Sequence, residues 1–302
     1  MMNLKGMMKM KNLGLAGIVL LGLTFTACSK DTEENGGTSE TPRSVVITTR
    51  QISYEGAGQA LEDENTITDM KACLFEKGAM TKVFENLQLS DNGYNLQINS
   101  YEGTIYMIAN AGNMIDLQQM KSDGISEEEW KKATMSMSNG KVVNFFTGSL
   151  VIDGQNQPSQ SLTLKRGVAR FDLNVDVAGS AAIESLTLKN VAQSGYLFVQ
   201  GEGAEYPADA ERDDISVHFD TALSASTPGV LYVYEQKNTG IEVSIEAVID
   251  GQHKVLTKTL EGNLKRNTIY TVTVRKNDID IVVKVGIDDW EPGEDTEIIP
   301  QL

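Results

Sequence analysis

Short apolar stretches with period-two alternation dominate the chain from about residue 43 onward. They are rich in Val, Ile, Thr and Tyr and are separated by Gly, Asn and Asp. This pattern predicts β-strands, because successive side chains of a strand point to opposite faces of a sheet. We predict strands at residues 44–50, 68–76, 94–99, 103–109, 142–152, 161–176, 183–189, 196–199, 215–219, 230–235, 241–249, 253–260, 268–275 and 279–288.

One segment departs from this pattern. Between residues 113 and 134 the apolar positions have helix-like spacing, and Ser126 with Glu129 can form a capping box. The predicted fold class is therefore all-β, with one or two short helices in the first half of the chain.

The length of the chain predicts two domains. Residues 28–302 exceed the usual size of a single domain, and we place the division between 43–157 and 158–302. Residues 154–160, which contain Pro158 and three glutamines, are the predicted junction, and a long hairpin loop is the alternative reading. The sequence Val-Ile-Asp-Gly-Gln occurs at 151–155 and again at 248–252. A shared Asp-Gly hairpin turn explains this repeat as well as duplication does.

The N-terminus has the pattern of a bacterial lipoprotein signal. Three lysines precede an apolar run from Leu13 to Leu23, and a small residue lies directly before Cys28. The run is too short to span a membrane as a helix, so the pattern favours secretion, cleavage and acylation of Cys28 over an N-terminal transmembrane anchor. We expect residues 1–27 to be a signal peptide, and residues 28–42, rich in Ser, Thr, Glu and Gly, to be a disordered tether.

The charge balance excludes nucleic acid as an expected partner. Without the three lysines of residues 1–27 the formal charge falls from −16 to −19, and an acidic surface repels a phosphate backbone. Once Cys28 is acylated, Cys73 has no second cysteine with which to pair. We expect Cys73 to be a buried thiol in a strand.

Residues with catalytic or metal-binding chemistry are few. The two histidines, His218 and His253, lie in a strand pattern and at the exit of a predicted turn, and no nucleophile motif accompanies them. The acidic clusters 127–129 and 288–291 lack the alternating oxygen ligands and the glycine of a calcium loop. We therefore predict no enzymatic activity, no metal site and no cofactor.

The two ends of the folded region carry the most regular strand patterns. Residues 44–49 form a compact β-prone run between Arg43 and Arg50. Near the C-terminus five branched residues alternate without interruption, and the intervening positions are largely charged. These residues are Ile279, Ile281, Val283, Val285 and Ile287.

Most of the mature chain resembles the fimbrillins, or type V pilins, of Bacteroidales. The resemblance lies in the order and spacing of several segments along the chain. These are the lipoprotein signal, the β-run ending at Arg50, Thr147-Gly148, the segment Leu164–Leu173 (LKRGVARFDL), the strand Asn267–Val274 and Trp290-Glu291-Pro292-Gly293.

The resemblance implies two transthyretin-like β-sandwich domains and export as an outer-membrane lipoprotein to the cell surface. It further implies that an arginine-specific protease removes the first strand, and that a donor strand from a neighbouring fimbrial subunit fills the exposed groove. Carried onto this sequence, Cys28 takes the lipid, Arg50 is the cleavage point with Arg43 as second choice, and residues 279–302 are the donor segment.

These observations indicate a structural subunit of an adhesive fimbrium, and they leave alternatives open. The protein could instead be the anchor or the tip of a fimbrium. A surface glycan-binding lipoprotein would share the signal and the sandwiches but would need exposed aromatic platforms. A secreted hydrolase would need catalytic residues that the sequence does not reveal.

Overall fold

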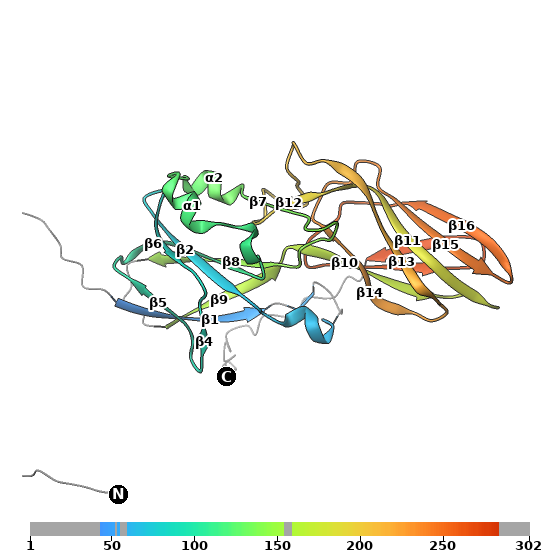
Figure 1. Cartoon of the computed structure of the whole chain (residues 1–302), viewed down its shortest axis with the longest axis horizontal. Coiled ribbons are helices and arrows are strands. Elements are labelled where there is room, and N and C mark those ends of the chain that lie inside the picture. Colours follow the sequence, from blue (N-terminus) through green and yellow to red (C-terminus); the bar gives the residue numbers. More distant parts are fainter. Residues whose placement is uncertain (1–42, 52, 55–58, 154–158, 284–302) are drawn as a thin grey trace, which may run out of the picture. The chain divides into compact units, whose positions relative to one another are not determined.

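The computed structural model describes residues 43–51, 53–54, 59–153 and 159–283, which fall within one compact unit. Strands predominate and the few helices are short, which confirms the all-β prediction (Figure 1). No helix in the described residues is long and apolar enough to cross a membrane.

The first half of the described chain builds one eight-stranded sheet with the strand order β3-β2-β6-β8-β9-β1-β5-β4. Its strands are β1 (Arg43–Gln51), β2 (Met70–Glu76), β3 (Ala79–Phe84), β4 (Leu89–Ser90), β5 (Gly93–Ile98), β6 (Glu102–Ala109), β8 (Phe146–Asp153) and β9 (Ser159–Arg166). Apolar side chains of β1, β5 and β9 pack with those of β2, β6 and β8 in a single buried core. The sheet therefore encloses its own core.

Two short helices cover the other side of this sheet. Helix α1 (Leu117–Ser122) and helix α2 (Glu127–Lys131) lie on one side of β2 and β6 (Figure 1), and α2 places the fully buried Trp130 against Phe75 and Tyr106. The predicted capping box is confirmed, because Ser126 and Glu129 satisfy each other's backbone N–H groups. Short 3-10 turns, η1 (Glu62–Asn65) and η2 (Gly112–Met114), complete the connections.

The second half forms two four-stranded sheets, β14-β10-β17-β18 and β13-β11-β15-β16, which enclose a separate apolar core. Their strands are β10 (Val168–Val175), β11 (Ala181–Ala192), β13 (Arg212–Leu223), β14 (Thr227–Tyr234), β15 (Glu242–Ile249), β16 (Gln252–Thr259), β17 (Ile269–Val274) and β18 (Ile279–Val283). A further two-stranded pair joins β7 (Thr134–Ser136) to β12 (Ser194–Tyr196).

The Asp250-Gly251 turn between β15 and β16 has the predicted chemistry. Both residues have positive φ, 50° and 74°, as a two-residue hairpin requires. His253 follows this turn within β16, and His218 lies within β13, as predicted. Cys73 is fully buried in β2, which confirms the prediction for the thiol.

The prediction of one strand over residues 161–176 is wrong, because two strands meet there. Gly167 separates β9 from β10, and a Cβ at this position would lie 2.0 Å from the Phe145 ring. The chain passes so close to the ring that only glycine fits. Strand β9 pairs with β8 and β1, whereas β10 pairs with β14 and β17. The division into domains at residue 157 stays a prediction.

Candidate functional site: the first strand and its polar anchorage

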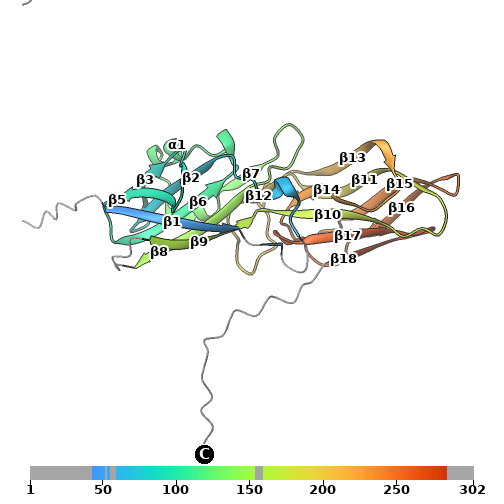
Figure 2. The same ribbon diagram turned by 90° about the horizontal axis from the view of Figure 1, so that it is seen from below.

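Strand β1 is an internal strand of the eight-stranded sheet. It runs antiparallel to β5 from Arg43 to Ile47 and parallel to β9 from Val46 to Gln51 (Figure 2). Its side chains Val45 and Ile47 are fully buried in the core. Their burial contributes roughly 3–6 kcal/mol, at about 1.5–3 kcal/mol for each side chain. Loss of β1 would therefore open both an apolar groove and two strand edges.

Arg43 begins this strand and is held in place. Its Nε donates to the carbonyl oxygen of Ser100 at 3.1 Å, and its guanidinium lies 4.4 Å from the centre of the Tyr101 ring. Both contacts fix the side chain against the loop before β6.

Arg50, near the end of β1, has a different environment. Its backbone pairs with Thr163 of β9, but its side chain is exposed. That side chain has no hydrogen bond or ion pair with any other described residue. Within the described part of the chain, the guanidinium group is therefore exposed and without a partner.

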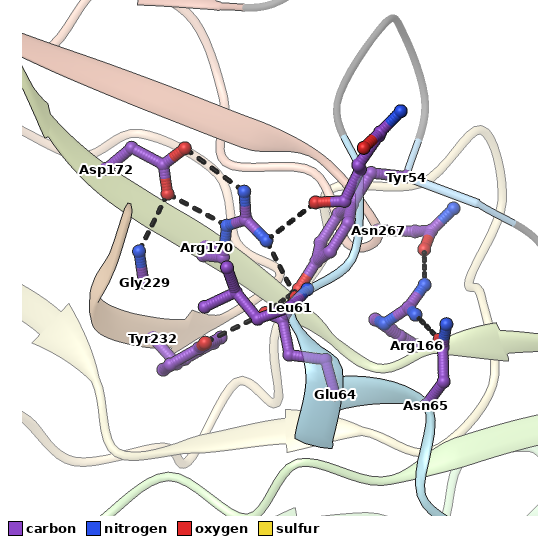
Figure 3. A network of polar contacts seen from close by, with 11 residues as sticks. Tyr54, Leu61, Glu64, Asn65, Arg166, Arg170, Asp172, Gly229, Tyr232 and Asn267 are labelled. Carbon is purple, nitrogen blue, oxygen red and sulfur yellow. Dashed lines mark hydrogen bonds and ion pairs between the residues drawn. The ribbon is translucent and has the colours of Figure 1, made fainter. Parts of the chain in front are cut away.

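The chain after β1 is tied into a buried polar network (Figure 3). Gln51 Nε2 donates to the Asn65 carbonyl at 2.6 Å, and Asn267 Nδ2 donates to the Ser53 carbonyl at 2.8 Å. Tyr54 follows with only 2% of its surface exposed. Ser53 is thereby fastened to a residue 214 positions away in the sequence, and Gln51 is fastened to Asn65.

Glu64 is the central acceptor of this network. It accepts from the hydroxyl groups of Tyr54 at 2.6 Å and Tyr232 at 2.8 Å, and from the backbone N–H of Leu61 at 2.5 Å. Arg170 Nη1 completes the set at 2.7 Å. Burial alone would raise the pKa of Glu64, but the hydrogen bonds from Tyr54, Leu61 and Tyr232 and the charge of Arg170 outweigh it and lower the pKa. Glu64 is therefore a charged carboxylate that accepts from four donors.

Arg170 bridges Glu64 to Asp172. Its Nε and Nη2 atoms meet the two Asp172 oxygens at 2.8 and 3.1 Å, and Nη1 also donates to the Gln59 carbonyl at 3.1 Å. Asp172 accepts in addition from the backbone N–H of Gly229. Burial opposes the charge on Arg170, but its two carboxylate partners raise its pKa. Such a bidentate ion pair is strong when the remaining hydrogen-bonding groups of both side chains also have partners.

Arg166, which is fully buried, forms the other arm of the network. Its guanidinium lies over the rings of Tyr54 and Phe146, at 4.4 and 5.1 Å, and it donates to the side chains of Asn65 and Asn267. Burial lowers the pKa of this arginine. The Arg-Gly-Val-Ala-Arg-Phe-Asp run, Arg166 to Asp172, thus provides two arginines that bond to residues 59–65 and an aspartate that holds one of these arginines.

The sequence analysis identified this run but predicted no role for its charged residues. The spacing of charged residues within an otherwise apolar stretch was the signal that could have predicted a buried polar network. Tyr54 and Glu64 were missed, because nothing near them in the sequence marks a buried carboxylate. Their partners lie up to 168 residues away.

The structure places the predicted donor segment only in part. Ile279, Ile281 and Val283 belong to β18, which pairs antiparallel with β17 as the edge strand of its own sheet. Ile279 is buried, and the carboxylate of Asp280 meets Lys258 at 2.8 Å. Val285, Ile287 and the remainder to residue 302 lie outside the described residues, as does Cys28.

The described residues contain no group of three or more His, Cys, Asp or Glu side chains that could hold a metal ion. Within the described residues the network around Glu64 has no nucleophile beside a base. Glu64, Arg170 and Asp172 pair with one another, and Arg166 donates to the side chains of Asn65 and Asn267. Its chemistry is that of a structural anchor.

Comparisons with known structures show the same fold in fimbrial and adhesion proteins. The chain is similar to the tip fimbrial protein Mfa3 from Porphyromonas gingivalis with a C-terminal truncation, with a TM-score of 0.52 and 12% identity over 80% of this chain and 99% of that one. It is also similar to a candidate cell adhesion protein from Bacteroides eggerthii DSM 20697, with a TM-score of 0.51 and 13% identity over 80% and 94% of the two chains. At these identities the likeness shows the fold alone.

Comparison with protein families covers most of the sequence. The search among curated proteins found no match. A family model described as fimbrillin-A associated anchor proteins Mfa1 and Mfa2 matches residues 38–296, which include every described residue. The chain belongs to the family of fimbrillin-A associated anchor proteins Mfa1 and Mfa2.

Proposed function

We propose that this protein is a lipid-anchored subunit of an adhesive cell-surface fimbrium, and that it joins the fimbrium by strand exchange after proteolysis behind Arg50. The position of β1 carries this proposal. An internal strand with two fully buried side chains leaves an apolar groove when it departs, and unpaired strand edges attract a replacement strand.

The environments of the two arginines favour Arg50 as the cleavage point. An arginine-specific protease must take the arginine side chain into its own pocket. Arg43 would first have to give up its contacts with Ser100 and Tyr101, whereas the Arg50 side chain is exposed. Beyond Ile47 the strand also lacks pairing on the β5 side, so the scissile segment is held by backbone pairing with β9 alone.

The polar network supports the same cleavage point. Cleavage after Arg50 releases β1, but the chain from Gln51 onward stays bound through Ser53, Tyr54 and Glu64. The loss of structure is thus confined to one strand and the groove that it filled.

The donor in this proposal is the segment beginning at Ile279. Alternating branched residues suit a groove that had held Val45 and Ile47. Because β18 is a five-residue edge strand, it can leave its own sheet at lower cost than an internal strand. Donor and acceptor lie on different parts of one subunit, so the contact is head-to-tail and generates an open filament.

Limited proteolysis tests the assembly step. Trypsin at a limiting dose should create a new N-terminus at Gln51 and yield heat-labile ladders of oligomers on gels. Arg50→Gln should abolish both, because it removes the cleavage site. Arg43→Gln is the matched control and should leave both unchanged.

Truncation before Ile279 tests the donor and the position in the fimbrium. A protein that lacks residues 279–302 should be cleaved but should form no ladders. Ladders that form with Arg50→Gln would contradict the proteolytic trigger. Ladders lost with Arg50→Gln but kept after truncation would contradict the donor assignment and place the donor in another segment of this chain.

A further inference from the structure

A groove lies beside the C-terminal half of β1. Pairing of β1 with β5 ends at Ile47, whereas pairing with β9 continues to Gln51. Past Ile47 the space between β1, the β4–β5 hairpin and the segment 65–70 opens into a groove of about 1200 Å³ (β1, β4 and β5 in Figure 1). This volume is sufficient for a ligand of several rings.

The lining of the groove selects the chemistry of the ligand. Most of the polar residues that line it, from β1, the hairpin and the segment 65–70, carry hydroxyl or amide side chains. Asp69 and Asp91 add two carboxylates, and among the described residues none that lines the groove is Lys, Arg or His. Such a surface repels phosphate, sulfate and carboxylate groups, and it offers both donors and acceptors to an uncharged polar ligand.

The walls of the groove are held by hydrogen bonds before any ligand arrives. Thr48 Oγ1 donates to the Asn92 carbonyl at 3.3 Å, and Gln51 Nε2 donates to the Asn65 carbonyl at 2.6 Å. At Gly93 a Cβ would lie 2.5 Å from the carbonyl oxygen of Ile47, so the hairpin is seated closely on β1. A preformed site loses little entropy on binding.

The same contacts disfavour an added peptide strand. A strand pairing with β1 would have to run along the backbone from Thr48 to Gln51. The bonds to Asn92 and Asn65 bridge this edge at its two ends. A ligand held by side chains meets no such obstacle.

Several groups on the groove have no partner within the described residues and are available to a ligand. The side chains of Asp91 and Asn92, at the exposed tip of the hairpin, and the Thr49 hydroxyl make no hydrogen bond there. Leu89 at the rim is 68% exposed. A pyranose ring presents vicinal hydroxyls, which match a carboxylate beside an amide, and an apolar C–H face, which matches Leu89.

We propose that this groove is a binding site for a neutral glycan. The site binds sugar through side-chain hydrogen bonds and one aliphatic contact, in place of an exposed aromatic platform. It acts in the uncleaved monomer, so it does not depend on the polymerisation proposed above.

Binding is measured with protein purified after expression of the full chain and kept uncleaved. The probes are immobilised neutral polysaccharides, namely mannan, galactan and xylan, with heparin and polylysine alongside. We expect retention on at least one neutral polysaccharide. The double variant Asp91→Ala/Asn92→Ala should bind at least tenfold more weakly, as should Thr49→Val. Asp209→Ala, in an exposed turn of the second half, is the matched control and should bind as the unmodified protein does.

Circular dichroism verifies that the variants are folded. Binding that is unaffected by the hairpin substitutions, or retention on none of the neutral polysaccharides, would overturn the proposal. Preferential retention on heparin or polylysine would overturn it as well, the latter in favour of a basic peptide. Each of these outcomes leaves the assembly ladders untouched, so the two proposals fail separately.

Discussion

At the scale of single residues, Glu64 shows how a charged side chain can be buried without destabilising the fold. Its carboxylate receives two tyrosine hydroxyls, one backbone N–H and one guanidinium. A buried ion pair stabilises a protein only when the remaining hydrogen-bonding groups are satisfied. Here they are, and the result is a fixed link between residues 64, 170 and 232.

Replacement of Glu64 by Gln should therefore be costly. The amide keeps the shape of the side chain but leaves Arg170 with one carboxylate in place of two. We expect the free energy of unfolding to fall by about 3 kcal/mol, measured by urea denaturation. Glu62→Gln, on the exposed side of the same turn, is the control and should change it by less than about 0.5 kcal/mol. Equal effects of the two substitutions would contradict the role of the network.

The lowered pKa of Glu64 also predicts an acid-labile contribution to stability. The folded state holds a proton on Glu64 less readily than the unfolded state, whose glutamate pKa is about 4.3. The stabilisation is therefore complete above that value and is lost as the pH falls through the lower folded-state pKa. Below about pH 4.3 the free energy of unfolding should decrease more steeply for the native protein than for Glu64→Gln. Parallel pH profiles would refute this.

At the scale of elements, the alternating patterns predicted most strands correctly. A strand with one buried face has apolar residues at every second position, so its own sequence shows which face is buried. The run 161–176 is the instructive failure. It reads as one continuous strand, but the Phe145 ring forces a break at Gly167. That ring comes from 22 residues upstream, and local alternation carries no information about it.

Gly167→Ala should consequently destabilise the protein through a single contact. The added methyl group would overlap the Phe145 ring, and we expect a loss of about 1–3 kcal/mol in the free energy of unfolding. In a Phe145→Ala background the space is empty, so the same substitution should cost less than about 0.5 kcal/mol. Denaturation of the four proteins of this double-mutant cycle measures the coupling. Costs that simply add would show that the Phe145 ring is not the reason for glycine at this position.

The parts of the candidate site also differ in whether local sequence could predict them. The position of β1 and the arginines at its ends could be predicted, because they depend on a short contiguous segment. The network around Glu64 could not, because Arg166 meets Asn267 and Arg170 meets Glu64 across more than 100 residues of sequence. These groups come together only in the assembled fold, where Arg166 and Arg170 lie on strands of different sheets.

At the scale of the whole molecule, the proposed attachment to the membrane depends on one residue. If Cys28 carries the lipid, cells expressing Cys28→Ala should yield protein without label from radioactive palmitate. Cys73→Ala is the control and should keep the label, because that thiol is buried in β2. Label that persists in Cys28→Ala would place the anchor elsewhere.

The whole molecule must also survive the loss of its first strand if it is to receive another. The contacts that hold residues 53–65 involve Arg166, Arg170, Tyr232 and Asn267. The contact from β1 comes from Gln51, which stays with the chain after cleavage behind Arg50. The core enclosed by the second half is likewise built without β1. Cleavage after Arg50 and release of β1 should therefore weaken only the sheet that β1 leaves.

Hydrogen exchange on the cleaved monomer can detect this division. We expect amide protection to fall in β5 and β9, which lose their partner, and to persist in residues 59–65 and in β10 and β17. A synthetic peptide spanning residues 279–287 should restore protection in β5 and β9, because its branched side chains can occupy the places of Val45 and Ile47. A peptide with Ile281 and Val283 replaced by Asp is the control and should restore none. Loss of protection that spreads through residues 59–65 and β10 would show that β1 is needed for the fold as a whole, and that a state open to strand exchange does not persist.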